Sequence, residues 1–217
     1  MENGSQLTIH WLDSVGSTQR YLLDGLKNSD LTAPVCIAAH EQTEGKGSRG
    51  NRWEGLSGNL FFSFAIERKE LPKDLKLESS SIYFTYLLKK VLSEAGSKVW
   101  LKWPNDFYLG NKKIGGALTN VYGEILVCGI GLNIKQAPDG FEILDIDISQ
   151  KKVLESYFKK LEKFFSWKQI FSKFELEFDK SRMTATTLDY EKISLKNAIL
   201  LEDGSIECNG QRMYSLR

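Results

Sequence analysis

Short apolar runs and two helix-like stretches alternate along the chain up to residue 135. Residues 18–28 and 79–96 carry apolar side chains at helical spacing, and each stretch begins at a hydroxyl residue that can cap a helix, Ser17 or Thr18 in the first. Runs rich in β-branched and aromatic residues predict strands over 7–15, 34–41, 59–67, 98–103, 106–121 and 124–135.

Turn residues indicate how these strands pair. Gly110-Asn111 suits a two-residue hairpin turn inside 106–121, and Tyr122-Gly123 joins that run to 124–135. We therefore expect an α+β fold, in which helices pack on one face of a mixed, mostly antiparallel sheet.

The pattern changes after residue 149. Residues 149–180 place large apolar side chains on one stripe and lysines on the other, which predicts a core-facing helix, or two helices with a break near Ser166. A helix lying on a membrane surface is the alternative. From Tyr190 the pattern is strand-like again, with a hairpin turn at "EDGS" (202–205). We expect one domain over 1–180 and a small β domain over 181–217.

Composition and charge narrow the class of protein. The chain has 217 residues, 41% of them hydrophobic, which is ample for a packed core. Lys and Arg total 29 against 28 Asp and Glu, so no global field favours nucleic acid or an anionic membrane. The start lacks a signal peptide, and no apolar run approaches the roughly 20 residues of a membrane span. Three dispersed Cys and two His indicate buried, reduced thiols rather than a zinc site, and a cytoplasmic protein.

The stretch "EGKGSRGNRW" (44–53) contains G-x-G-x-x-G, which by itself is a weak signal. A dinucleotide-binding loop would lead into a helix, but a strand follows here, and the Walker A and kinase motifs are absent. Lys46, Arg49 and Arg52 alternate with the glycines, so backbone N–H groups and cations can together meet a phosphate. A flexible surface turn is the alternative.

A second group of residues lies in "LKWPNDFYLGNKKIGG" (101–116). Pro104 interrupts the strand, which frees the side chains of Asn105 and Asp106 from ladder pairing. Lys113 lies on the far arm of the hairpin beside two glycines. Taken alone, the group reads as a plain turn with an exposed lysine.

Together the motifs resemble the biotin–protein ligase family. The segments "EQTEGKGSRGNRW", "SGNLFFSF", "LKWPNDFYLGNKKIGG" and "GIGLNI" occur in the family's order and spacing. The resemblance covers roughly residues 8–135, and "KWPND" followed by Lys113 is its most specific part. It implies a catalytic domain like those of class II aminoacyl-tRNA synthetases and biotin ligases, an abbreviated SH3-like C-terminal segment, and the monofunctional type without a DNA-binding domain.

The resemblance implies a two-step reaction. Biotin and ATP, with Mg²⁺, give biotinyl-5′-AMP, and a lysine of a biotin carboxyl-carrier protein then takes the biotinyl group. Residues carried over as catalytic are Lys113, Lys46 and Asp106. Biotin-binding residues by similarity are Ser17, Thr18, Gln19, Gln42, Lys46, Gly47, Ser48 and Lys113. Nucleotide-binding residues by similarity are Gly45, Arg49, Trp53, Asn105 and Asn133, and no protein metal ligand is implied.

Physical chemistry fits these assignments. The neutral ureido head of biotin loses about 1–3 kcal/mol for each unpaired buried polar group, and glutamine offers both a donor and an acceptor. A carboxylate that attacks a phosphate requires fixed cations, and Lys113 and Lys46 are expected to converge there. Asp106 either accepts the proton of the acceptor amine, or binds a metal ion, or stabilises the geometry of the hairpin. Trp53 either shields adenine or packs in the core.

Two departures from the family pattern concern the glycine loop. Lys46 stands where arginine is usual, and a lysine lacks the bidentate fork of arginine. Ser48 occupies the position of the family's second loop arginine, which helps to retain the adenylate. Either the adjacent Arg49 takes over this retention, or the adenylate is held less tightly.

Three alternatives remain. A lipoate or octanoate ligase is expected to carry "RRxSGGG", which is absent, and a non-catalytic biotin-binding protein needs neither the loop nor Lys113. A nucleic-acid-binding module is expected to carry an excess of basic residues, which this chain lacks. A homodimer through an exposed sheet edge is left open.

Overall fold

The computed structural model describes residues 7–47, 52–188 and 191–215. The chain divides into two compact units, Met1–Leu71 with Ile114–Ile143, and Pro72–Lys113 with Leu144–Arg217. The expected domain boundary between residues 180 and 181 stays a prediction.

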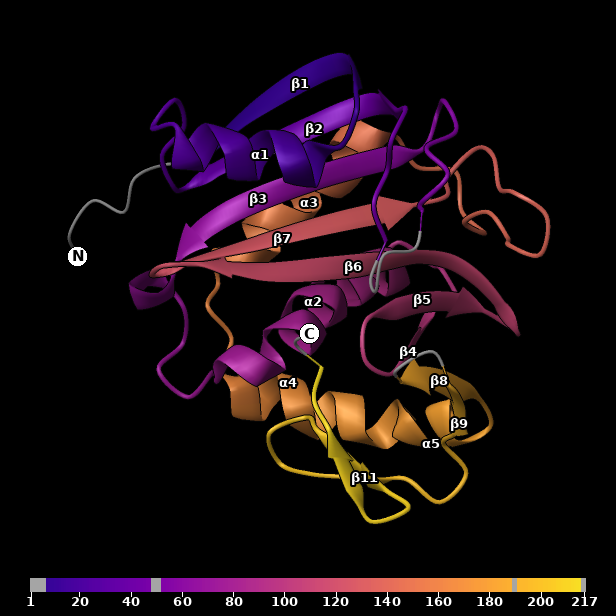
Figure 1. Cartoon of the computed structure of the whole chain (residues 1–217). Helices are drawn as coiled ribbons and strands as arrows, with labels where there is room; N and C mark the ends of the chain where they lie inside the picture. Colours follow the sequence, from indigo (N-terminus) through magenta and orange to yellow (C-terminus); the bar gives the residue numbers. More distant parts are fainter. Residues whose placement is uncertain (1–6, 48–51, 189–190, 216–217) are drawn as a thin grey trace. The chain divides into compact units, whose positions relative to one another are not determined.

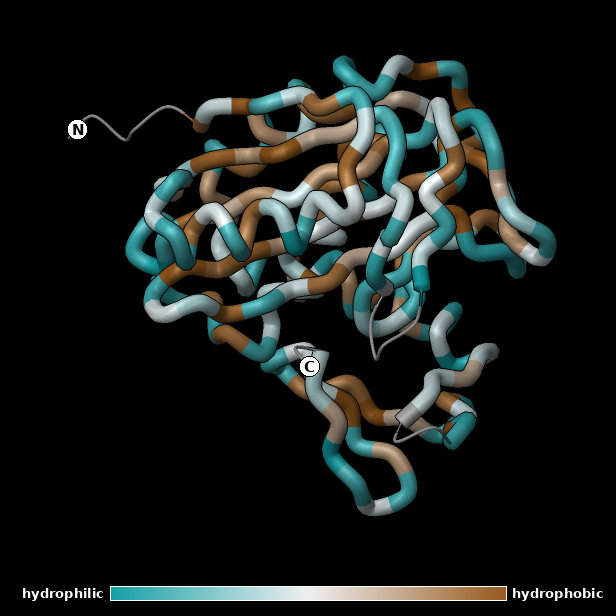
Figure 2. The backbone as a smooth tube through the Cα atoms, turned by 45° about the horizontal axis from the view of Figure 1, so that its top comes forward, coloured by the Kyte–Doolittle hydropathy of each residue, from teal (hydrophilic) through white to brown (hydrophobic). Residues whose placement is uncertain are grey.

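The first unit is built on a mixed sheet. Its strands lie in the order β1 (Thr8–Val15), β2 (Val35–Gln42), β3 (Leu60–Glu67), β7 (Ile125–Leu132) and β6 (Lys112–Tyr122). β1 pairs parallel to β2 and the remaining neighbours pair antiparallel. Figure 2 shows hydrophobic positions running along the strands and hydrophilic ones at many turns.

Helix α1 (Thr18–Lys27) covers one face of this sheet (Figure 1). Leu22 and Leu26 of α1 are buried in a cluster with Val35, Ile37, Ala65 and Val127 of the strands. The expected helix is confirmed, and Ser17 is its N-cap, because its hydroxyl accepts a hydrogen bond from the backbone N–H of Arg20 at 3.5 Å.

The second unit contains the remaining helices and short strands. Its helices are α2 (Ser80–Glu94), α3 (Gln150–Leu161), α4 (Trp167–Phe174) and α5 (Phe178–Arg182). The predicted break near Ser166 is confirmed: Ser166 and Gln169 form a reciprocal capping box at the start of α4. The strands are β4 (Trp100–Lys102), β5 (Asp106–Leu109), β8 (Ala185–Leu188), β9 (Glu191–Ser194), β10 (Ile199–Leu200), β11 (Ile206–Cys208) and β12 (Gln211–Met213). Short 3₁₀ turns occupy Arg68–Glu70 in the first unit, and Leu77–Ser79 and Glu175–Glu177 in the second.

The C-terminal turn at 202–205 is tied to other segments of its own unit by hydrogen bonds. Trp103 Nε1 donates to the carbonyl of Gly204 and Trp167 Nε1 to that of Glu202, each at 2.8 Å. Ser79 Oγ donates to the carbonyl of Asp203 at 2.6 Å. The turn at 202–205 therefore holds the indole of Trp103, the residue that precedes "PND".

The fold class is confirmed: helices pack on a mixed, mostly antiparallel sheet, with a small β segment at the C-terminus. Cys36, Cys128 and Cys208 are buried and free, and burial raises the pKa of the Cys128 thiol to about 12. In the described residues, no helix has the length and apolar character that crossing a bilayer requires.

Candidate functional site

The glycine loop forms a two-armed ribbon at the end of β2, which we call the glycine ribbon (residues 42–47 and 52–55). Lys46 bridges to Arg52, and the N–H of Trp53 donates to the carbonyl of Gly45 at 2.8 Å. A Cβ at Gly45 would lie 2.4 Å from the carbonyl oxygen of Trp53, so only glycine allows this close approach. Ser48 and Arg49 lie outside the described residues.

The base of the ribbon is attached to the turn before α1. The backbone N–H groups of Thr43 and Glu44 donate to the carbonyls of Val15 and Gly16, at 3.1 and 2.7 Å. Arg20 forms an ion pair with Glu44, and its hydrogen bond and charge hold the pKa of that exposed carboxyl below the usual value. The cations Lys46 and Arg52 add smaller effects in the same direction.

Two of the predicted biotin-binding residues, Thr18 and Gln42, meet at the start of α1. Gln42 Oε1 accepts from the backbone N–H and from the hydroxyl of Thr18, at 2.8 and 3.1 Å, and the Thr18 hydroxyl also contacts Ser63 Oγ at 2.9 Å. Ser63 is the polar residue in the otherwise apolar run "LFFSFA" of β3, and that interruption is the signal that could have identified it.

The side chain of Gln19 forms hydrogen bonds that stabilise the fold. Its Nε2 donates to Asn120 Oδ1 at 3.0 Å and to the carbonyl of Val127 at 3.1 Å, which ties α1 to β6 and β7. Its Oε1 is buried beside Gly129 and accepts no hydrogen bond within the described part of the chain. Gln19 is therefore a structural tie as well as a candidate ligand-binding residue.

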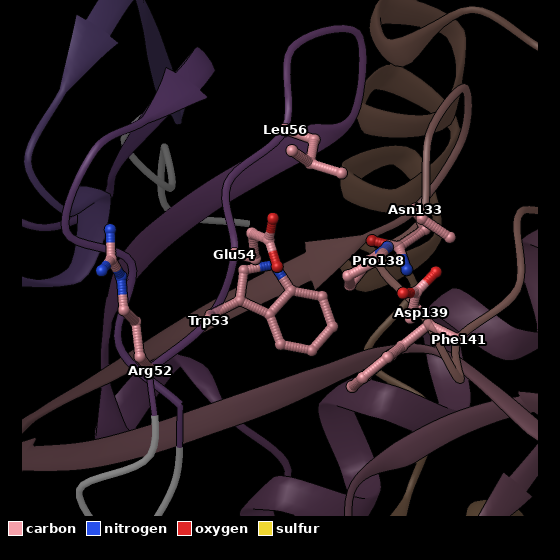
Figure 3. Close-up of a pocket in the computed structure, with 9 residues that line it drawn as sticks. Arg52, Trp53, Glu54, Leu56, Asn133, Pro138, Asp139 and Phe141 are labelled. Carbon is pink, nitrogen blue, oxygen red and sulfur yellow. The ribbon is translucent and has the colours of Figure 1, made fainter.

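A cavity of about 590 Å³ borders the second arm of the ribbon, residues 52–55. Its lining includes Arg52, Trp53, Glu54, Leu56, Asn133, Ala137, Pro138, Asp139 and Phe141, all in the first unit. Figure 3 shows Trp53 facing Asn133, Pro138, Asp139 and Phe141. The rings of Trp53 and Phe141 meet edge to face, with centroids 6.0 Å apart.

Asn133 is the fully buried polar group of this cavity. Its Nδ2 donates to the carbonyl of Glu142 at 3.3 Å, whereas no hydrogen bond from the described residues reaches its Oδ1. The cavity thus combines an aromatic wall with a buried amide acceptor, a combination that suits a planar, nitrogen-rich ligand. Sequence reasoning named Trp53 and Asn133 but missed Phe141, because nothing in the pattern of 136–143 marks it.

Asn59 holds the loop that carries one wall of the cavity. Its Oδ1 accepts from the backbone N–H groups of Ile134, Lys135 and Gln136, at 2.8, 3.0 and 3.2 Å. Its Nδ2 donates to the carbonyl of Gln136 at 2.8 Å. One buried amide thus replaces the strand partner that this backbone loses after β7.

We expect Asn59→Ala to destabilise the protein by roughly 2–4 kcal/mol, because it leaves several buried backbone groups without partners. Urea unfolding measures this free energy. Gln136→Ala is the control, since its exposed side chain makes a single hydrogen bond to the carbonyl of Ser57 and its loss costs at most about 1 kcal/mol. Equal losses in the two variants would contradict the role of Asn59.

The "WPND" hairpin lies in the second unit. β5 and the start of β6 form its arms, and Gly110 takes a φ of 52° at the turn. Lys113 Nζ lies 2.6 Å from Asp106 Oδ1, both side chains being largely shielded. Beside them, burial and the charge of Asp106 raise the pKa of Tyr108 to about 12. Asn105 lies in the turn between β4 and β5.

The structure therefore groups the predicted residues in two sets. Ser17, Thr18, Gln42 and the ribbon residues Gly45, Lys46, Gly47 and Trp53 are neighbours in the first unit, and Asn105, Asp106 and Lys113 lie together in the second. The predicted convergence of Lys46 and Lys113 joins the two units and stays a prediction. Among the described residues, no group of three or more His, Cys, Asp or Glu side chains is arranged to hold a metal ion.

Residues 11–135 match the model of the family described as "Biotin/lipoate A/B protein ligase family". Among solved structures, a biotin acetyl coenzyme A carboxylase synthetase from Helicobacter pylori with bound biotinylated ATP is 46% identical. The superposition covers 96% of this chain and 100% of that one, with a TM-score of 0.92. The biotin protein ligase of Aquifex aeolicus in complex with biotin and ATP is 26% identical over 97% of this chain and 99% of its own, with a TM-score of 0.73.

The bifunctional ligase/repressor BirA of Bacillus subtilis is 29% identical over 67% of this chain and 46% of its own length. The chain thus spans less than half of that relative. The family match, in contrast, extends over more than half of the 217 residues. The chain belongs to the biotin/lipoate A/B protein ligase family.

Proposed function

We propose that the protein is an ATP-dependent biotin–protein ligase that forms biotinyl-5′-AMP and transfers the biotinyl group to a lysine of a biotin carboxyl-carrier protein. The observation that carries this proposal is the likeness, over nearly the whole chain, to the Helicobacter pylori protein solved with biotinylated ATP. The two sets of candidate residues described above support it.

In the first step, the biotin carboxylate attacks the α-phosphorus of ATP, and pyrophosphate leaves. Lys113 and Lys46 supply positive charge to oxygens that are negative in both reactants. Asp106, 2.6 Å from Lys113, restricts where that ammonium group can lie, so the charge is oriented before the substrates arrive. The glycine ribbon, with Gly45 and Gly47, offers backbone N–H groups to the phosphates. Arg49, which follows Gly47 by two positions in the sequence, is proposed as a further cation for them.

The cavity beside Trp53 is the proposed site for the adenine ring. An aromatic side chain that stacks on a base contributes about 1–3 kcal/mol, and Trp53 and Phe141 both border this cavity. The buried Oδ1 of Asn133 is an acceptor suited to an exocyclic amino group. Glu54 and Asp139 at the rim disfavour the phosphates there, which leaves the phosphates to the ribbon.

The second step requires a neutral acceptor lysine. A free lysine amine has a pKa near 10.4, so about 4.6 kcal/mol is needed to deprotonate it at pH 7. Asp106 is the carboxylate we propose to accept this proton. The neutral amine then attacks the carbonyl carbon of biotinyl-5′-AMP, an amide bond forms, and AMP leaves. Mg²⁺ enters with ATP as part of the substrate, because its preferred oxygen ligands are then the phosphates and water.

The polar cluster at α1 favours biotin over lipoate. Thr18, Gln42 and Ser63 form a hydrogen-bonded set, which suits a ligand with a polar head better than an acyl chain.

We infer a cytoplasmic location, because the three cysteines are free and buried, as in proteins of reducing compartments. A homodimer stays a prediction, to be measured by sedimentation.

The test is incubation of the protein with MgATP, radiolabelled biotin or lipoate, and an apo carrier domain. The expected result is a labelled carrier with biotin alone, in an ATP-dependent reaction that releases pyrophosphate. A labelled carrier with lipoate would support the lipoate ligase, and biotin binding without ATP consumption would support a binding protein.

A second measurement addresses the replacement of the family's second loop arginine by Ser48. Release of biotinyl-5′-AMP is followed in the absence of the carrier, with and without Arg49→Ala. Faster release from the variant assigns retention of the adenylate to Arg49, whereas unchanged release excludes that role.

A further inference from the structure

A second lysine lies on the strand face that carries Asp106. In the pairing of β4 with β5, Lys102 lies directly opposite Asp106, and Trp100 lies directly opposite Tyr108. Successive side chains of a strand point to opposite faces, so these four residues share one face, and the alternate residues of both strands are fully buried on the other. Asp106 also lies 2.6 Å from Lys113 Nζ at the start of β6. Lys102, Asp106 and Lys113 therefore form a row across three neighbouring strands, which we call the charged row.

The ammonium group of Lys102 lies over an aromatic ring. Its Nζ is 5.3 Å from the centroid of the Tyr108 ring, within the range of cation–π attraction. The Tyr108 ring packs against Trp100, with centroids 5.3 Å apart, and Trp100 Nε1 donates to the carbonyl of Gly110 at 2.9 Å. Burial and the charge of Asp106 raise the pKa of Tyr108 to about 12, so its phenol brings no negative charge at neutral pH. The hairpin thus holds Lys102 in place as a cation.

The net charge of the charged row comes from Lys102. Lys113 and Asp106 form an ion pair, so their two charges sum to zero. Lys102 makes the sum over the three side chains positive. A polyanion such as a triphosphate is attracted more strongly by a set with net positive charge than by a neutral pair.

We propose that Lys102 binds the β- and γ-phosphates of ATP and stabilises the pyrophosphate as it leaves. The inference rests on the proposed function, in which Lys113 acts where the biotin carboxylate meets the α-phosphate. Strands two apart in a sheet are separated by roughly 10 Å, so a lysine on β4 can contact a different phosphate from the one at Lys113.

The role of Lys102 follows from the bonds that change. A carboxylate oxygen of biotin forms a bond to the α-phosphorus, and the bond from this phosphorus to the bridging oxygen of pyrophosphate breaks. The electron pair of the broken bond stays on the pyrophosphate, roughly in line with the attacking oxygen. The ammonium group of Lys102 meets the negative charge that develops there.

Lys102→Gln is expected to separate the two half-reactions. Isotope exchange between pyrophosphate and ATP, dependent on biotin, is expected to slow by roughly thirty- to a hundredfold. Transfer from added biotinyl-5′-AMP to an apo carrier domain is expected to stay within about twofold, because pyrophosphate has already left. Lys102→Arg keeps a cation that can stack on Tyr108, and is expected to recover most of the exchange activity.

Product inhibition locates the contact along the nucleotide. In Lys102→Gln, the inhibition constant of pyrophosphate is expected to rise by about tenfold, whereas that of AMP stays within about twofold. Lys98→Gln is the matched control, since Lys98 lies just before β4 with an exposed side chain. It removes the same charge and is expected to leave both half-reactions and both inhibition constants within about twofold.

The outcomes distinguish this inference from the proposed function. If wild-type protein catalyses the exchange but Lys102→Gln slows both half-reactions equally, Lys102 supports the fold and the inference is wrong. Equal weakening of AMP and pyrophosphate, or unchanged exchange, also overturns it, and the proposed function stands in all three cases. Wild-type protein that catalyses neither the exchange nor the transfer overturns both.

Discussion

Lys113→Gln is expected to slow formation of biotinyl-5′-AMP by roughly a hundred- to a thousandfold. Removing a fixed cation from a site of developing negative charge has an effect of this size. The change also leaves the Asp106 carboxylate, 2.6 Å from the lysine, without its partner and close to the anionic substrates. Isotope exchange between pyrophosphate and ATP, dependent on biotin, measures this step without the carrier.

Lys112→Gln is the matched control. Lys112 precedes Lys113 in β6, and its side chain is exposed, so the same charge is lost from the chain outside the candidate site. The control is expected to retain activity within about twofold. Equal losses in the two variants would show that Lys113 acts only through net charge, and full exchange activity in Lys113→Gln would remove it from the catalytic set.

Gly204→Ala is expected to destabilise the protein by about 2–5 kcal/mol. Gly204 has a φ of 76°, which costs an alanine about 1–2 kcal/mol. Its new Cβ would also lie 2.7 Å from Ile82 Cδ1 and 3.1 Å from the Trp167 ring, and such overpacking costs a further 1–3 kcal/mol or so. Urea unfolding measures the loss.

Gly210→Ala separates the two causes. Gly210 has nearly the same φ, 75°, but a Cβ there meets nothing within 4 Å, so only the backbone cost of about 1–2 kcal/mol applies. The difference between the variants then reports how tightly the C-terminal turn packs against its unit. Equal losses would mean that this turn is loosely held and does not support Trp103.

Most elements were predictable because their signals are local. The cap at Ser17, the helical spacing of Leu22 and Leu26, and the break at Ser166 each follow from neighbouring residues, and the structure has all three. The strand β8 was not predicted, because Ala185–Leu188 has no alternation that distinguishes a strand from a loop.

Spacing along the chain was enough to select the candidate residues and the family, since "KWPND", the glycine loop and Lys113 are read directly from the sequence. The remaining features of the site depend on contacts between residues that are distant in the sequence. Asn59 and Phe141 lie in segments whose local pattern says nothing about ligands, and Ser63 is marked locally only as a polar interruption of an apolar run. Ser63 contacts Thr18, which lies 45 residues away in the sequence, and Asn59 contacts Ile134, which lies 75 residues away. The orientation of the Gln42 amide likewise depends on Thr18, because the orientation of an amide is set by whichever donor the folded chain brings to it.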